Sequence, residues 1–119
     1  MATPQTHSMK RIALLLAALL LLTALAACSS EPERLRLADL ASFTDRYDRS
    51  VVVTEGTVRA HDEPAHFWIE DEALNRVRIV PGSAIDAHVD ERVRVQGVFR
   101  YSAEAGRRIE ADQVTVVTP

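Results

Sequence analysis

The segment VVVTEGTVRA, residues 51–60, alternates apolar with polar side chains and carries Gly56 at its centre. Such alternation is typical of a β-strand with one buried face. An interior glycine in a long strand usually marks a bulge or a sharp bend. We therefore expect this segment to form a strongly curved strand, and we expect the rest of the fold to be built around it.

Four further runs rich in valine and isoleucine follow the first. They cover residues 65–71, 76–80, 92–101 and 108–117, and Gly97 interrupts the fourth strand as Gly56 interrupts the first. The stretch Glu72-Ala73-Leu74-Asn75 is typical of a hairpin turn, and Ala105-Gly106 predicts a turn before the last strand. The connection 81–89 is long enough for one helical turn around residues 84–87. The pattern predicts an all-β domain of five strands.

A single helix is expected before the first strand. Apolar residues recur near helical spacing between Leu35 and Tyr47, at Leu37, Leu40, Ala41, Phe43 and Tyr47. This spacing predicts one amphipathic helix of about three turns, which Asp48-Arg49-Ser50 ends. Residues 29–34 are polar and predict a short flexible tether in front of it.

The order of three phrases resembles the OB-fold, a small five-stranded Greek-key barrel. They are VVTEGTV at residues 52–58, FWIED at 67–71 and VRVQG at 93–97. They look like small exported bacterial OB-fold proteins and, more distantly, like the anticodon-binding type of OB domain. The resemblance implies a closed or nearly closed barrel over residues 51–117 with the helix packed on one end. It implies a binding surface without naming the ligand.

Alternation also predicts which side chains face outward. If Phe67 and Ile69 point inward, then His66, Trp68 and Glu70 point outward. Val77, Ile79, Val93 and Val95 are likewise expected to be buried, and His66, Arg76 and Arg78 to be exposed. A turn centred on Ala73 pairs Glu70 with Arg76, Trp68 with Arg78, and His66 with Val80.

This outward patch of His66, Trp68, Glu70, Arg76 and Arg78 is the predicted binding site, because OB-folds usually bind on the outer surface of strands two and three. An indole beside guanidinium groups suits stacking on a sugar, a base or a partner's side chain. The same residues can instead form cross-strand pairs, each contributing about 0.2–1 kcal/mol to the hairpin and binding nothing. Both interpretations stay open at the level of sequence.

Histidines give a second, weaker candidate. His61, Asp62, Glu63 and His66 lie within six residues, and a loop could fold them around a divalent metal ion. Such a site needs three or four ligands, so His88 would have to come from the distant connection. We therefore expect no metal site, and we keep His61, His66 and His88 only as weak candidates. No cofactor is expected.

No catalytic motif is present in the sequence. There is no Gly-x-Ser-x-Gly, no His-Glu-x-x-His, no glycine-rich phosphate loop and no free cysteine nucleophile. The part after residue 27 carries 12 arginines and no lysine against 17 acidic residues, a formal net charge of −5. This acidity argues against nucleic acid as a partner. We expect a protein that is not an enzyme.

The N-terminal residues resemble an export signal. Lys10 and Arg11 precede an uncharged apolar run that starts at Ile12, as in the charged and apolar regions of a secretory signal. The run of about sixteen residues is slightly short for a membrane-spanning helix, which is the alternative. The signal is complete from Met9, although the sequence leaves open whether translation starts there or at Met1.

The end of the run resembles the lipobox of bacterial lipoproteins, with Leu25-Ala26-Ala27 directly before Cys28. The resemblance implies that residues 1–27 are removed and that Cys28 receives a diacylglycerol group and often a further fatty acid such as palmitate. Two or three acyl chains hold a protein on a membrane stably. Ser29, where an aspartate commonly retains such proteins at the inner membrane, implies an outer-membrane location facing the periplasm.

The expected organisation is a signal at residues 1–27, a lipidated cysteine and tether at 28–34, and a helix plus OB-fold-like domain at 35–119. The function expected first is a non-catalytic binding or adaptor module that is anchored to the membrane and engages an envelope protein or glycan. The alternatives are a metal-binding envelope lipoprotein and a purely structural lipoprotein.

Overall fold

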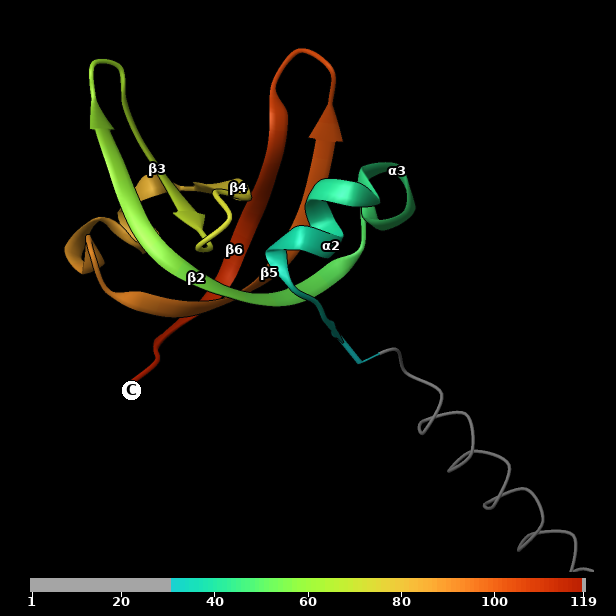
Figure 1. Ribbon diagram of the computed structural model, residues 1–119, viewed down its shortest axis with the longest axis horizontal. Coiled ribbons are helices and arrows are strands. Elements are labelled where there is room, and N and C mark those ends of the chain that lie inside the picture. Colours follow the sequence, from blue (N-terminus) through green and yellow to red (C-terminus); the bar gives the residue numbers. More distant parts are fainter. Residues whose placement is uncertain (1–30, 119) are drawn as a thin grey trace, which may run out of the picture. The chain divides into compact units, whose positions relative to one another are not determined.

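The computed structural model describes residues 31–118, which form an all-β unit with only short helices (Figure 1). Its elements are β1 (Glu33–Arg34), α2 (Leu37–Ser42), α3 (Thr44–Tyr47), β2 (Val51–Asp62), β3 (Ala65–Glu70), β4 (Arg76–Val80), the 3₁₀ turns η1 (Gly82–Ala84) and η2 (Asp86–His88), β5 (Arg92–Ser102) and β6 (Gly106–Val116). The predicted signal, the tether up to Ser30 and Cys28 lie outside the described residues.

The strands form one sheet in the order β1-β2-β3-β4-β6-β5, and β2 pairs with β5 as well. Only β4 with β6 and β1 with β2 run parallel. The first half of β2 pairs with β5 and the second half with β3, and the change of partner occurs at Thr57. Figure 1 shows β2 curving strongly along its length, as the sequence predicts. The pairings therefore run in a circuit from β2 through β3, β4, β6 and β5 back to β2.

The two strand glycines act in different ways. Gly56 keeps a regular pair with Val93, so there is no bulge at that point. A Cβ at Gly56 would lie 2.8 Å from Cδ1 of Leu37 and 3.0 Å from Cβ of Ile69. The absence of a side chain at Gly56 therefore lets Leu37 and Ile69 pack against the backbone of β2. At Gly97 the register shifts against β6, and a Cβ there would collide with the carbonyl of Glu110. The bulge is thus confirmed only at Gly97.

The inward faces of the strands and α2 form one core. The segment between β4 and β5 adds Ile85 to this core. Ile85 lies between η1 and η2 and is fully buried. Ile69, Val77, Ile79, Val93 and Val95 are buried as predicted, whereas Phe67 is only partly buried and packs against the core. The predicted helical turn at residues 84–87 is replaced by the two 3₁₀ turns on either side of Ile85.

The prediction of one helix over residues 35–47 is wrong, because the chain breaks at Phe43. There φ is −125° and ψ is 48°, and the Phe43 side chain is 51 % exposed although the helical spacing had placed it on the apolar face. Ser42 and Thr44 flank the break, and both are weak helix formers. Leu37, Leu40 and Tyr47 still reach the core, so two short helices bury what one helix was expected to bury.

Part of the tether predicted over residues 29–34 is a strand. Glu33 and Arg34 pair in parallel with Val52 and Val53, and the amide of Leu35 donates to the carbonyl of Val53 at 2.9 Å. A strand at Glu33 and Arg34 was not predicted, because both residues are polar. The apolar residues of this pairing, Val52 and Val53, belong to β2. The described chain is therefore fixed to the sheet from residue 33.

Candidate functional site

The predicted patch lies on the outer surface of β3 and β4, where the register is the expected one. Trp68 pairs with Arg78 and Glu70 pairs with Arg76 across the hairpin. The turn between them is held by Asp71, whose two carboxylate oxygens accept hydrogen bonds from the amide and the side chain of Asn75 at 2.9 and 2.8 Å. The third expected pair, His66 with Val80, is absent, because the pairing of β3 with β4 ends at Trp68 and Arg78.

Glu70 has the predicted direction but is covered by its neighbours. Its side chain points outward, but the residue is only 9 % exposed. Oε1 accepts a hydrogen bond from Nε of Arg59 at 2.9 Å, and Oε2 accepts one from Nε of Arg76 at 2.9 Å and one from the Trp68 indole at 3.3 Å. The two guanidinium groups cover the carboxylate, which alternation alone cannot predict. Arg59 also contacts Asp90 and was missed at the sequence level.

The charge on Glu70 is stabilised by these donors. Burial by itself raises the pKa of Glu70, but the hydrogen bonds from Arg59, Trp68 and Arg76 outweigh it and hold the pKa below the ordinary value for glutamate. Glu70 is therefore an anion at neutral pH whose oxygens are already used. It is better suited to fixing the positions of its neighbours than to holding a ligand.

Trp68 stands in a column of flat side chains. The rings of His61 and His66 are stacked with centroids 5.2 Å apart, the His66 and Trp68 rings are also 5.2 Å apart, and the guanidinium of Arg76 lies 5.3 Å from the Trp68 centroid. Trp68 is half-buried and outside the core, and His66 is half-buried rather than exposed as predicted, because its neighbours in the column cover it. Arg76 and Arg78 are exposed as predicted.

A groove of about 290 Å³ opens beside this column. Its lining consists of His66, Trp68, Arg76, Arg78, Gly106 and Arg107. Gly106 and Arg107 were not predicted, because they enter the site through the parallel pairing of β4 with β6, which joins segments far apart in the sequence. Gly106 has φ of +72° and open space where a Cβ would stand, so it narrows the groove little.

Positive charge is incompletely neutralised in the groove. Arg76 is paired with Glu70, but within residues 31–118 neither Arg78 nor Arg107 forms an ion pair. Arg78 stands beside Arg108 across the β4–β6 ladder, and Glu110 lies 3.9 Å from Arg108 and 3.4 Å from Arg100. One exposed carboxylate thus faces two arginines on β5 and β6. The arrangement leaves two guanidinium groups available to an anion from outside.

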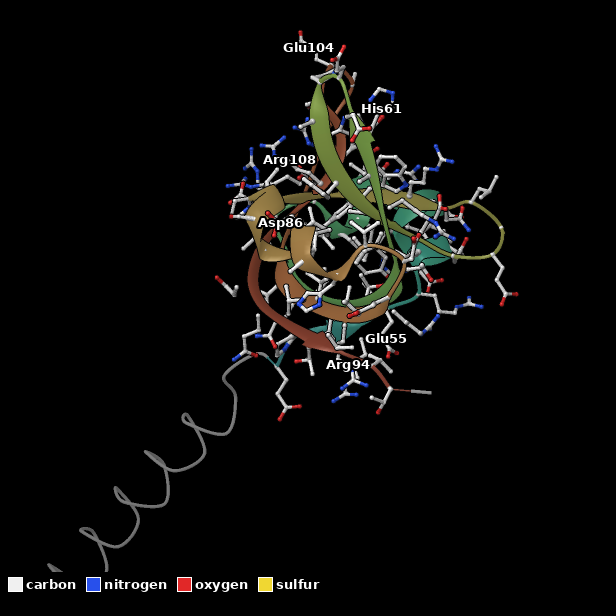
Figure 2. All side chains as sticks on the ribbon, turned by 90° about the vertical axis from the view of Figure 1, so that its left-hand side faces the viewer. Glu55, His61, Asp86, Arg94, Glu104 and Arg108 are labelled. Atoms are coloured by element: carbon white, nitrogen blue, oxygen red, sulfur yellow. The ribbon has the colours of Figure 1, made fainter. Side chains whose placement is uncertain are left out.

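His61 and His66 stack on each other, but His88 does not join them. His61 lies near the tip of the β2–β3 hairpin, apart from the connection that carries Asp86 (Figure 2). His88 of that connection contacts Glu91 at 3.0 Å, and Nδ1 of His66 lies 2.7 Å from the Pro64 carbonyl. Among the described residues no three His, Cys, Asp or Glu side chains are grouped so that they could hold a metal ion. The weak metal candidates therefore gain no support.

Comparison with known proteins gives a fold and no activity. No protein-family model matches the chain, and no curated protein matches it. Two solved structures each match 76 % of it with 14 % sequence identity and a TM-score of 0.51: a "putative aspartyl-tRNA synthetase" from Leishmania major Friedlin and a DUF3299 family protein from Pseudomonas aeruginosa PAO1. The chain spans 21 % of the first and 99 % of the second. No helix in the described part is long and apolar enough to cross a membrane.

Proposed function

We propose that this protein is a non-catalytic binding module that engages an envelope glycan or protein through the outer surface of β3 and β4. The observation that carries the proposal is the groove beside Trp68, in which Arg78 and Arg107 have no acidic partner within the described residues. Six of the described arginines form no ion pair, and Arg78 and Arg107 are the two of these that line this groove.

We further propose that residues 51–117 form an OB-fold-like barrel. Support comes from the circuit of pairings in which β2 meets both β3 and β5, and from the bulge at Gly97, which bends a strand as closure requires. The match covers 99 % of the chain of a DUF3299 family protein, so a fold of this kind can account for nearly all of a protein.

Membrane anchoring through Cys28 is part of the same proposal. It rests on the charged start, the short apolar run and Leu-Ala-Ala-Cys at its end. The first strand β1 begins only five residues after Cys28. A lipid on this cysteine would hold the binding surface at the membrane of the cell envelope, and Ser29 favours the outer membrane.

A purely structural role is the second candidate, and one observation favours it. Glu70, Trp68, Arg59 and Arg76 satisfy one another within the domain, as residues that only stabilise a hairpin would. The two roles differ at Arg78, because this side chain belongs to the groove and not to the network around Glu70.

Charge reversal at Arg78 tests the proposal. The full-length chain and its Arg78→Glu variant are produced in the source cells, crosslinked in intact envelopes and isolated, and the attached proteins and glycans are identified. Arg46→Glu on α3 is the matched control, because Arg46 is also exposed and has no ion pair within the described residues. We expect a partner that Arg78→Glu loses and Arg46→Glu retains. An identical set of partners for all three proteins contradicts binding through this face.

A further inference from the structure

The second half of β6 is a free edge of the sheet. β4 pairs with β6 only from Arg108 to Glu110, whereas β5 pairs with it as far as Val116. Residues 111–116 therefore have β5 on one side and no described strand on the other. The unpaired backbone groups of such an edge are a template for pairing with a further strand.

The hydrogen bonds to β5 show which backbone groups face this edge. The amide of Val117 donates to the carbonyl of Arg92 at 2.9 Å, so Val117 directs its backbone groups toward β5. Hydrogen-bonded and non-hydrogen-bonded residues alternate along an antiparallel pair. Thr115 therefore also bonds to β5, whereas Val114 and Val116 point away from it. These two valines present two N–H donors and two carbonyl acceptors to a further strand.

The side chains of this edge also lack a neighbour. Val116 lies opposite Val93, which is fully buried, yet Val116 itself is 40 % exposed. From Gln113 to Val117 the chain has no charged residue and no proline, although these are common means of protecting a sheet edge. Valine and threonine are favoured in strands. A strand laid along this edge would cover Val116 and continue the sheet.

The sequence of the edge suits a second copy of the same chain. A two-fold axis pairs a segment with itself, so the segment must be complementary to its own reverse. Val114 and Val116 flank Thr115 symmetrically. An antiparallel pair with its axis at Thr115 therefore places each of these valines opposite a valine of the other copy.

The charges at the two ends of the edge are complementary. Asp112 precedes the uncharged segment, and Arg92 lies beside Val117 at its far end. Both are exposed, and within residues 31–118 neither forms an ion pair. The acidic neighbours of Arg92 contact other partners, Asp90 with Arg59 and Glu91 with His88. Antiparallel pairing brings Asp112 of one copy to the Arg92 end of the other.

We propose that this protein forms a symmetric dimer through β6, in which residues 113–117 of two copies pair antiparallel about Thr115. The sheet then continues from one copy into the other. The dimer uses the half of β6 that does not line the groove beside Trp68. It is therefore a property beyond the proposed binding function, and either proposal can fail without the other.

A cysteine at the axis tests the pairing. Residues opposite each other in a non-hydrogen-bonded pair have Cα atoms about 4.5 Å apart, which a disulfide can bridge. Thr115→Cys is therefore expected to crosslink two copies. Gln113→Cys is the matched control, because Gln113 is also exposed but would lie opposite Val117 of the other copy. Two cysteines at 113 would then be four residues apart, about 14 Å, which is beyond the reach of a disulfide.

The full-length variants are oxidised with copper phenanthroline in intact envelopes of the source cells and compared on a non-reducing gel. We expect most of Thr115→Cys to shift to twice its mass and to return on reduction. Gln113→Cys should stay at the level of the unmodified chain, which also controls for Cys28. A mixture of Gln113→Cys and Val117→Cys chains should crosslink, because the proposed register places these positions opposite each other.

Charge exchange distinguishes a second copy from any other partner. Thr115→Lys and Thr115→Glu each place like charges opposite each other at the axis, which should weaken the dimer by about two- to fivefold. Sedimentation equilibrium of the full-length protein in a neutral detergent measures this loss. A mixture of the two variants should recover the dimer, because opposite charges then meet. Thermal melting shows that the fold is retained, as expected for the exposed Thr115 side chain.

Three results would overturn the inference. One is crosslinking of Thr115→Cys that is no stronger than that of Gln113→Cys. Another is crosslinking of Thr115→Cys to a different protein, which would assign the edge to another partner. The third is a mixture of the lysine and glutamate variants that dimerises no better than each variant alone.

Discussion

Replacing Glu70 with glutamine removes the negative charge from the centre of the network and leaves the shape of the side chain almost unchanged. Each hydrogen bond from a guanidinium to a carboxylate contributes about 1.5–3 kcal/mol when it is shielded from water. Here the carboxylate side chain is 10 % exposed, but the Arg59 and Arg76 side chains are 42 % and 53 % exposed, so solvent weakens both interactions. We expect Glu70→Gln to lower the free energy of unfolding by about 1–2 kcal/mol.

Thermal and urea unfolding, followed by circular dichroism, measure this loss. For a domain of this size the expected decrease in Tm is roughly 5–15 °C. Glu110→Gln is the matched control, because Glu110 also faces two arginines but is 47 % exposed. It should cost less than about 0.5 kcal/mol. An equal loss for the two variants, or no loss at Glu70, would refute the argument that burial makes the difference.

The pH dependence gives a second check on the same residue. The folded pKa of Glu70 is lowered, so its contribution to stability is fully present above the pKa of glutamate in the unfolded chain. That contribution is lost as the pH falls through the lower, folded pKa. The difference in unfolding free energy between the unmodified chain and Glu70→Gln should therefore be constant near neutral pH and should shrink only in acid. A difference that persists at strongly acidic pH would show that charge is not its cause.

Three further outcomes are expected. Gly97→Ala places a methyl group against the Glu110 carbonyl at the bulge and should destabilise the domain by about 1–3 kcal/mol, measured by urea unfolding; a neutral result would contradict the close approach. Phe43→Ser should change stability by no more than about 0.5 kcal/mol, since the side chain is half exposed, whereas a large loss would indicate that Phe43 packs into the core. Cys28→Ala should abolish lipid incorporation, and mass spectrometry of the native protein should find Cys28 lipidated at the N-terminus; an unmodified Cys28 or an intact preceding segment would disprove the anchor.

The hairpin of β3 and β4 could be predicted from sequence because its information is local. Alternation fixed the buried positions Ile69 and Val77, and the turn residues placed Trp68 opposite Arg78, as the structure confirms. A short turn leaves few ways of pairing two strands, and a shift by one residue would have exposed the apolar face. The core of the candidate site was therefore recognisable before the fold was known.

The parts that sequence reasoning missed depend on distant segments. Arg107 enters the groove because β6 pairs in parallel with β4, and no local pattern indicates that neighbour. Arg59 could have been found, since it has the outward parity of β2 and pairs with Trp68. Its partner Asp90, on the connection to β5, could not. The burial of the outward-pointing Glu70 was not predicted, because strand periodicity gives the direction of a side chain and not what covers it.

The pairing of β1 with β2 has a consequence for where this protein can work. With a lipid on Cys28, as proposed, only four residues lie between the lipidated cysteine and Glu33, where the chain is fixed to the sheet. Even a fully extended backbone spans no more than about 18 Å over that distance. The domain is then held close to the membrane surface and cannot reach deep into the periplasm. Any partner has to come to the membrane surface, where confinement to a thin layer raises the local concentration of both.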